Sequence, residues 1–369
     1  MDLDLTPEQD MLRDTVRGLC SRHCDLTVVR ALEDDPVGYP TALGEQLGAL
    51  GLMGMTRPEQ HGGSGMTMLD AAIVYSELGR ALAPTPHFPS AVLAGGLLAR
   101  TGATEWLPRI ASGEAIVVPA WLEPGGGYGP AGVTLAATPS AGGGYRLSGV
   151  KRHVPFASAA ARLLVLARTP TDLVYVLVDP DATGVTLTQQ KTIASDTQYR
   201  VDFADVTVDA ADVVGSGWAP WDRVMHDGII LLAAQAVGGA RYALDITTQY
   251  AKDRRQFDKP LGAFQALAHY LADAVTAVDG AETLVYEAAW AASEGRDTRR
   301  LAPMAKLFAC RTFRDVTAMA QQIFGGVGFT LDYDIQLFFR RAKQQELSYW
   351  DTRYLEELVA ADVLDAAGV

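Results

Sequence analysis

Arg254-Arg255-Gln256-Phe257 runs into Gly262-Ala263-Phe264-Gln265, and Gln322-Ile323-Phe324-Gly325-Gly326-Val327-Gly328-Phe329 follows further along the chain. Helical periodicity surrounds both motifs. Apolar residues recur at helical spacing from Ile229 to Leu244, which predicts a long helix before the first motif. Further helical stretches are predicted at residues 263–292, 299–324 and 334–346. Long helices in succession indicate an antiparallel four-helix bundle over residues 221–369.

The first segment of the chain, residues 1–115, also has a helical pattern. Thr6 and Pro7 form a typical helix start, with polar first-turn residues after them. Apolar positions then recur at helical spacing, and a stretch of breakers at residues 58–65 separates the earlier helices from the later ones. We therefore expect an N-terminal α-helical domain.

Residues 116–220 change to a β pattern. Short segments of β-branched and aromatic residues alternate with glycine, proline and aspartate turns. The expected strands are residues 116–121, 133–138, 145–150, 163–167, 174–178, 185–188 and 199–206. This spacing predicts a middle antiparallel β-domain. The predicted fold class is α+β, with this domain between the N-terminal helices and the C-terminal bundle.

Composition argues against several functional classes. The chain has 369 residues and a net charge of −13, which argues against nucleic-acid binding. Its start, Met1-Asp2-Leu3-Asp4, lacks an apolar signal region, and no uninterrupted apolar run of about 18 residues suggests a membrane span. Cys20, Cys24 and Cys310 make no disulfide framework, and no second ligand pair accompanies Cys20, His23 and Cys24. We expect a cytoplasmic protein without a metal site.

Further motifs connect the chain to a known family. They are Leu5-Thr6-Pro7-Glu8-Gln9, Pro58-Glu59-Gln60-His61-Gly62-Gly63, Tyr75-Ser76-Glu77-Leu78-Gly79 and Ser148-Gly149-Val150-Lys151. With the two C-terminal motifs they occur in the order and spacing typical of the acyl-CoA dehydrogenase family, which the whole chain resembles. The resemblance is to a small bacterial subunit that lacks the usual catalytic glutamate. It implies a flavoprotein oxidoreductase of fatty acid or lipid metabolism.

The resemblance also implies a mechanism and an FAD site. In this family a carboxylate removes the α-proton of an acyl thioester while a hydride leaves the β-carbon for the flavin. An arginine can form two bonds to the FAD diphosphate, and glycines let a backbone approach it. The first motif is expected to reach FAD from one chain and the second from another. The residues that match the adenine half are Arg254, Phe257, Gln265, Gln322, Gly325 and Gly326.

The flavin-ring half departs from the family pattern. The family's Thr-Glu-Pro segment is replaced by Leu122-Glu123-Pro124, and its Trp-Ile-Thr (or Ser) segment by His153-Val154-Pro155. Pro155 offers neither a hydroxyl nor an N–H to the flavin. Leu122, His153 and Pro155 are the candidate ring-side residues. Either they hold the ring differently, or this subunit's own β-domain does not hold it.

The base is the sharpest departure. Counting along the chain places the family's glutamate at Tyr349 and its following glycine at Trp350, whereas a second family position for the base falls on Gly228. A tyrosine, with an ordinary pKa near 10, makes a poor base at neutral pH. The nearby acids are Asp227, Asp351 and Glu346, and each is equally well explained as a solvated helix or loop carboxylate. Asp351 and Asp227 are retained as alternative bases.

Three interpretations of function remain. The favoured one is FAD-dependent dehydrogenation of an acyl-CoA or carrier-protein thioester by a hetero-oligomer whose related subunit supplies the base. The others are a self-sufficient enzyme with a relocated base or altered, even non-redox, chemistry, and a non-catalytic structural subunit. Dehydrogenation also requires an electron-transfer partner. The small residues Gly238 and Gly239 would let another helix approach closely or leave room for an acyl chain, and the apolar helix predicts an oligomer, most simply a tetramer.

Overall fold

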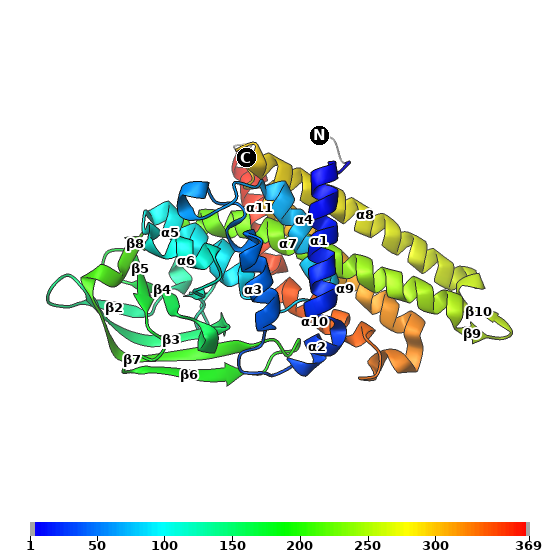
Figure 1. Cartoon of the computed structure of the whole chain (residues 1–369), viewed down its shortest axis with the longest axis horizontal. Helices are drawn as coiled ribbons and strands as arrows, with labels where there is room; N and C mark the ends of the chain where they lie inside the picture. The colour runs from blue at the N-terminus through cyan, green and yellow to red at the C-terminus, as the bar shows by residue number, and fades with distance from the viewer. Residues whose placement is uncertain (1–3, 367–369) are drawn as a thin grey trace. The chain divides into compact units, whose positions relative to one another are not determined.

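The computed structural model describes residues 4–366; residues 1–3, which hold most of the expected acidic N-terminus, and residues 367–369 lie outside the described part. The chain divides into two compact units (Figure 1). The first, here called the helical unit, comprises Met1–Val29, Thr67–Ala83 and Ile229–Val369. The second, the sheet unit, comprises Arg30–Met66 and Pro84–Gly228. The domain boundaries near residues 115 and 220 stay a prediction.

The sheet unit contains an eight-stranded sheet with the order β6-β7-β3-β2-β4-β5-β8, and β1 pairs with β4 (Figure 1). Neighbours are antiparallel except that β1 and β2 each meet β4 in parallel. The strands are β1 (Val117–Ala120), β2 (Ala136–Pro139), β3 (Tyr145–Pro155), β4 (Arg162–Arg168), β5 (Leu173–Val178), β6 (Val185–Gln190), β7 (Gln198–Val208) and β8 (Val213–Ser216). Every expected strand overlaps one of these, whereas β8 was not expected.

Short helices complete the sheet unit. They are α3 (Thr41–Ala49), α5 (Gly95–Thr101), α6 (Leu107–Ala111) and a π-helix, η3 (Phe88–Ala94), preceded in the chain by α2 (Leu26–Ala31). The sheet's core consists of alternating buried positions such as Leu147, Val165 and Val201, which are fully buried. The loop before α3 is tied to this sheet because the Tyr199 hydroxyl donates to the Pro36 carbonyl at 2.7 Å. Side chains from separate sequence segments therefore fix the sheet unit.

The helical unit joins the N-terminal helices α1 (Pro7–His23) and α4 (Met68–Arg80) to the C-terminal helices (Figure 1). The expected helix start at Thr6 and Pro7 is confirmed, and the structure adds a capping box in which Thr6 and Gln9 cap each other at the start of α1. The C-terminal helices are α7 (Ala219–Asp253), α8 (Gln265–Ser293), α9 (Leu301–Phe324), α10 (Ile335–Leu347) and α11 (Thr352–Ala366). The expected bundle helices are thus confirmed, and α11 is an addition.

Helices α4 and α7 pack at backbone contact. A Cβ added to Gly238 would collide with the Ser76 carbonyl oxygen, and one added to Gly79 would collide with the Gln235 carbonyl oxygen. On another side of α7, Gly239 lies against the Phe313 ring, 2.5 Å from an added Cβ. The small residues therefore serve close helix packing. The alternative, that they leave room for an acyl chain, is wrong at these positions.

Helix α7 is long and apolar enough to cross a membrane by length and composition alone. However, 72% of its most apolar window is buried inside the structure, which is the behaviour of a core helix. Its burial follows from packing against α4 and α9, as the contacts of Gly238 and Gly239 show. Helix α7 is therefore a core helix of the helical unit.

We predict that Gly238→Ala lowers the free energy of unfolding by at least about 1–3 kcal/mol, because the new methyl group must push α4 away from α7. Chemical denaturation with a helix-sensitive signal measures this change. Gly280→Ala on α8 is the matched control: its Cβ would meet only Phe308, at 3.6 Å, so up to about 1 kcal/mol of stabilisation is expected. Equal effects of the two substitutions would contradict the close-packing explanation.

Candidate functional site

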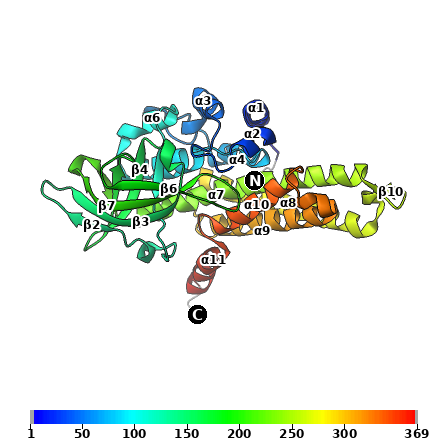
Figure 2. The same ribbon diagram turned by 90° about the horizontal axis from the view of Figure 1, so that it is seen from below.

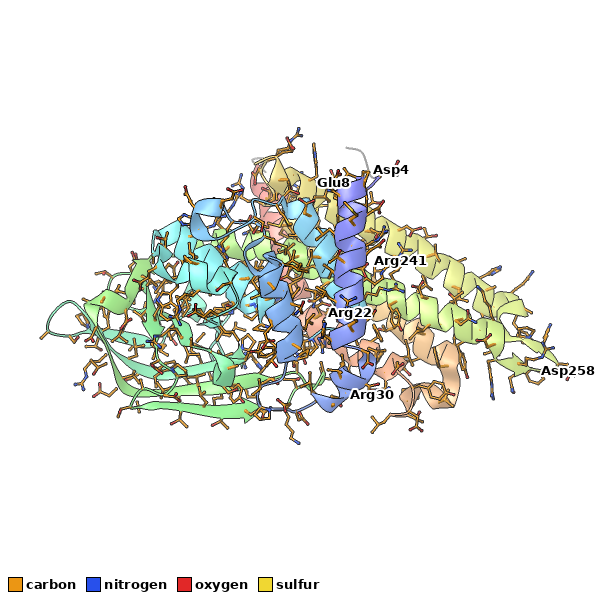
Figure 3. The ribbon with its side chains drawn as sticks, viewed as in Figure 1. Asp4, Glu8, Arg22, Arg30, Arg241 and Asp258 are labelled. Atoms are coloured by element: carbon orange, nitrogen blue, oxygen red, sulfur yellow. The ribbon has the colours of Figure 1, made fainter. Side chains whose placement is uncertain are left out.

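The first C-terminal motif forms an exposed hairpin at the end of α7. Its strands are β9 (Arg255–Gln256) and β10 (Lys259–Pro260), and Figure 2 shows them at one end of the helical unit, while Figure 3 marks Asp258 at the tip. Arg254 and the Phe257 side chain are exposed, Phe257 at 87%. The Leu261 N–H donates to the Arg254 carbonyl at 2.9 Å and closes the hairpin base. The hairpin thus exposes a cation and an aromatic ring three residues apart in the sequence.

The second motif lies at the same end of the helical unit. Tyr250, in the last turn of α7, stacks on Phe324 with ring centroids 4.2 Å apart. Phe324 ends α9, and Gly325, with φ 64°, and Gly326 follow it; a Cβ added to either glycine would meet nothing within 4 Å. Gln322 and Gln265, the first residue of α8, are also exposed. One chain therefore presents both motifs at one end of the helical unit, and the expected contribution of the two motifs to FAD from different chains stays a prediction.

On the ring side, the Leu122-Glu123-Pro124 segment is fixed by a buried ion pair. Lys151 Nζ lies 2.6 Å from Glu123 Oε1 and also donates to the Trp121 carbonyl at 3.2 Å. The Thr134 and Leu135 backbone N–H groups donate to the same carboxylate, and so does the Thr134 hydroxyl. The Leu122 carbonyl accepts a hydrogen bond of 2.9 Å from the backbone N–H of Arg152, the residue after Lys151. The Leu122–Pro124 segment, which departs from the family pattern, is thus joined to the Ser148–Lys151 motif, which carried the resemblance.

Burial and the ion pair together shift the pKa values of Lys151 and Glu123. Burial lowers the pKa of Lys151 to about 8, although the Glu123 carboxylate opposes that change. Burial alone would raise the pKa of Glu123, but the Lys151 charge and the surrounding hydrogen bonds outweigh it and leave that pKa below its ordinary value. The Glu123 carboxylate therefore stays ionised and engaged. Sequence analysis missed this pair, because Lys151 lies among Ser148, Arg152 and His153 and its neighbours give no signal of burial.

His153 and Pro155 lie in an irregular stretch of β3. The register between β3 and β7 shifts between Lys151 and Val154, and His153 has φ 53°. The His153 side chain is exposed, and its Nδ1 lies 2.9 Å from Gln198 Oε1. Pro155 is buried and pairs with Gln198 at the end of the strand. A proline has no N–H there, so this residue donates no hydrogen bond to a ligand.

The predicted base position lies in a tight turn between α10 and α11. Tyr349 and Trp350 both have left-handed backbones, with φ 51° and 73°. Trp350 is fully buried, whereas Tyr349 is half-buried. Burial raises the pKa of Tyr75 well above its ordinary value, and the Tyr349 phenol adds to that rise. The turn therefore keeps the backbone form of a glycine at Trp350 and places a phenol, not a carboxylate, at position 349.

Each carboxylate near the two base positions has a structural partner. Asp351 Oδ1 accepts the Tyr354 N–H at 3.0 Å and caps α11. Asp227 lies 2.5 Å from Arg100 and 3.6 Å from Arg223. The side chain of Glu346 is buried and paired with two cations, Arg314 and Lys343. These contacts favour structural roles over proton abstraction for all three acids.

The second base position, Gly228, is closed by packing. A Cβ added there would lie 3.1 Å from Leu93 and 3.3 Å from Phe88, both in the π-helix η3. Gly228 is buried in α7. A carboxylate-bearing side chain at this position would have to displace these neighbours, so the sheet unit does not leave a ready place for a base there.

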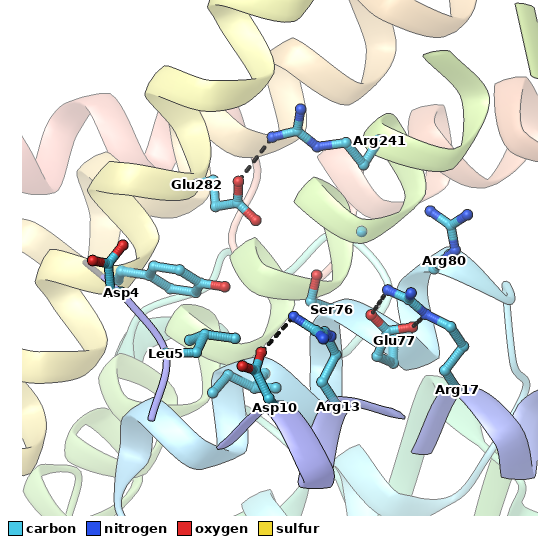
Figure 4. A pocket seen from close by; sticks show the side chains of 13 residues that line it. Asp4, Leu5, Asp10, Arg13, Arg17, Ser76, Glu77, Arg80, Arg241 and Glu282 are labelled. Atoms are coloured by element: carbon cyan, nitrogen blue, oxygen red, sulfur yellow. Dashed lines mark hydrogen bonds and ion pairs between the residues drawn. The ribbon is translucent and has the colours of Figure 1, made fainter. Parts of the chain in front are cut away.

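The helical unit contains a cavity of about 560 Å³ whose lining includes none of the predicted site residues (Figure 4). It is lined by four arginines, Arg13, Arg17, Arg80 and Arg241, each paired with a carboxylate. Arg17 and Glu77 form two hydrogen bonds, of 2.9 and 2.7 Å. Because the charges neutralise one another, this cavity offers no free cation for a CoA phosphate.

Comparison with known proteins identifies the family. The family model for the acyl-CoA dehydrogenase N-terminal domain matches residues 6–114, and that for the C-terminal domain matches residues 215–348. The acyl-CoA dehydrogenase IpdE2 of Mycolicibacterium smegmatis is 31% identical, over 92% of this chain and 93% of the relative. The chain therefore belongs to the acyl-CoA dehydrogenase family of flavoprotein oxidoreductases, as the sequence motifs predicted.

Two solved assemblies have the same fold. The ChsE4–ChsE5 complex from Mycobacterium tuberculosis contains a chain that is 28% identical, with a TM-score of 0.89 and coverage of 99% of both chains. A variant of the Tcur3481–Tcur3483 steroid ACAD contains a chain that is 30% identical, with a TM-score of 0.87 and coverage of 98% of this chain and 99% of that one. The α+β fold prediction is confirmed.

We predict that Glu123→Gln lowers the free energy of unfolding by about 3–5 kcal/mol near neutral pH, because it leaves the Lys151 ammonium buried without its charge partner. The folded-state pKa of Glu123 is lowered, so the pair's contribution is full above the ordinary carboxylate range and is lost as the pH falls through the folded-state value. Denaturation series at several pH values should show the difference from wild type shrinking in acid.

Glu114→Gln provides the control for that experiment. Glu114 pairs with Arg109 at 2.8 Å on the surface, where its side chain is 63% exposed. Its replacement should cost at most about 1 kcal/mol. A Glu123→Gln effect as small as this, or one that does not change with pH, would contradict the assigned role of the buried pair.

Proposed function

We propose that this chain is one subunit of an FAD-dependent acyl-thioester α,β-dehydrogenase whose related partner subunit supplies the catalytic base. The observation that carries this proposal is the absence of a carboxylate at both base positions, Tyr349 and Gly228, in an otherwise complete family fold. The nearby acids support it because each has a structural partner. Asp351 caps a helix and Asp227 pairs with arginine.

The residues at the hairpin end fit the adenine half of FAD. Arg254 supplies a charge for the diphosphate, and Gly325 and Gly326 leave open backbone beside it. The exposed Phe257 ring gives an apolar surface for the adenosine. When bound, FAD supplies the hydride acceptor. On the ring side, Pro155 has no donor, so we assign the missing hydrogen bond, like the base, to the partner subunit.

Known relatives support an assembly of unlike subunits. The ChsE4–ChsE5 and Tcur3481–Tcur3483 proteins are each described as pairs of different chains. In the present chain, an apolar groove of about 290 Å³ between α8 and α9 carries the exposed side chains of Tyr270 and Phe308 with Arg311 and Asp315 at its edge. We assign this face to contacts with the related subunit, within a tetramer.

The remaining parts of the proposal concern substrate, acceptor and location. An acyl-CoA is the first substrate to test, with a carrier-protein thioester as the alternative, and an electron-transfer protein would reoxidise the flavin. The three cysteines are free and buried, which fits a reducing cytoplasm.

We predict that the chain alone dehydrogenates straight-chain acyl-CoA substrates far more slowly than about 1 s⁻¹, an ordinary enzymatic rate. Without a carboxylate against the α-carbon, the thioester α-proton is too weak an acid to be lost readily. Co-expression with a related subunit from the same genome should restore turnover, measured by reduction of a dye. Removing the partner's base glutamate should abolish that turnover, whereas Tyr349→Phe in this chain should change it little.

Other outcomes separate the alternatives. A pure single chain that reaches that rate would contradict the hetero-oligomer proposal, and Asp351→Asn, Asp227→Asn and Tyr349→Phe would then identify the relocated base. A chain that stays colourless with FAD, alone and with its partner, would favour a structural subunit.

We also predict that Arg254→Ala weakens FAD binding by about 2–3 kcal/mol, because it removes a charged contact to the diphosphate. Flavin retention during gel filtration and a fluorescence titration measure this loss. Arg255→Ala is the control: the neighbouring arginine is also exposed, but its guanidinium donates to the Asp258 carbonyl at 2.6 Å within the hairpin. Unchanged FAD retention in Arg254→Ala would count against the placement.

A further inference from the structure

The buried Lys306 side chain reaches the turn that carries position 349. Lys306 lies on α9 and is fully buried. Its Nζ donates to the Trp350 carbonyl at 2.8 Å and lies 3.4 Å from the Gln345 carbonyl. Gln345 belongs to the last turns of α10, and Trp350 follows that helix. One side chain thus connects α9 to both sides of the turn.

The turn needs such a connection because its backbone is strained. Tyr349 and Trp350 are consecutive non-glycine residues in the left-handed region, a conformation that persists only where surrounding contacts impose it. On one side, Asp351 fixes the chain by capping α11 through the Tyr354 N–H. On the other side, the Lys306 bond holds the Trp350 carbonyl. Both bonds end within two residues of position 349.

Burying the charged ammonium of Lys306 costs free energy unless its hydrogen bonds compensate for the lost contact with water. Burial lowers the pKa of this lysine, and the effects of Cys310, Asp351 and Glu346 only oppose that shift. Its hydrogen bonds go to the Gln345 and Trp350 backbone carbonyls, and the Glu346 carboxylate is itself paired with Arg314 and Lys343. Because the buried ammonium bonds mainly to backbone carbonyls, those hydrogen bonds have a geometric role in holding the turn.

We propose that Lys306 is the positioning residue of this turn, holding residue 349 where the family carries its base. The importance of position 349 for catalysis rests on the proposed function, whereas the geometry of the turn does not. Because the turn at residues 349 and 350 retains its backbone conformation, a carboxylate introduced by Tyr349→Glu would occupy a position that Lys306 keeps fixed.

Hydrogen exchange of the full chain tests the geometric part. In Lys306→Met, which keeps the chain length but removes the donors, amides of the peptide covering residues 345–356 should exchange at least about tenfold faster than in wild type. Peptides from α7 should be unchanged, and the melting temperature should change little, because the loss of two hydrogen bonds and the removal of a buried ammonium act in opposite directions. If the methionine variant does not fold, Lys306→Leu takes its place.

Cys310→Ala is the matched control for exchange. Cys310 lies one helical turn from Lys306, is equally buried, and its Sγ is 3.9 Å from the Gln345 carbonyl, but it has no bond to Trp350. In Cys310→Ala, the rate of amide exchange in the peptide covering residues 345–356 should stay within about twofold of wild type. Wild-type exchange in the Lys306 variant, or the same acceleration in Cys310→Ala, would overturn the proposal.

A kinetic arm tests the catalytic part. Tyr349→Glu should raise acyl-CoA dehydrogenation by the single chain by about a hundredfold or more. Adding Lys306→Met should remove most of that gain through kcat, with KM little changed, whereas adding Cys310→Ala should not. A yellow Tyr349→Glu protein without any gain would contradict the proposed function at position 349, and the exchange result would still decide whether Lys306 holds the turn.

Discussion

Helix α7 constrains the rest of the helical unit because its middle leaves no space for side chains. The backbones of α4 and α7 meet at Gly79 and Gly238, and the Phe313 ring of α9 covers Gly239. This packing fixes the position of α7 relative to α4 and α9. The Arg254 hairpin begins where α7 ends, and the stacking of Tyr250 on Phe324 brings the end of α9 to the same place. The Arg254–Phe257 motif and the Gln322–Phe329 motif therefore meet as a consequence of helix packing, although they are far apart in sequence.

Electrostatics separates the carboxylates that maintain the fold from any that could act as a base. A base must be ionised, accessible and free to take a proton. Glu123 is ionised but enclosed by Lys151 and backbone N–H groups, and Asp227 is held by Arg100. The Lys151 charge that keeps Glu123 ionised also lowers the proton affinity of that carboxylate, so Glu123 is poorly suited to abstract a proton from a thioester. The same interactions that stabilise this chain therefore remove its acids from catalysis.

The sequence predicted those parts of the structure that depend on local pattern. The helix start at Thr6 and Pro7, the strand segments and the long bundle helices all follow from the local pattern of residues. The sequence did not reveal contacts between distant segments, such as the Lys151 bond to Glu123 or the Lys306 bond to Trp350. Both lysines look like ordinary surface residues in a linear pattern. Their importance appears only when tertiary packing buries them beside particular acceptors.

The turn at Tyr349 and Trp350 shows that backbone form and side-chain chemistry can be lost separately. A tryptophan at φ 73° costs roughly 1 kcal/mol or more relative to glycine. That cost is offset by burial of the whole indole, which packs on Tyr354 with ring centroids 5.4 Å apart. The bond from Lys306 and the cap from Asp351 then fix the carbonyl and the helix on either side. The buried indole, the Lys306 bond and the Asp351 cap together hold the backbone of residue 349 in place, although the side chain there is not a carboxylate.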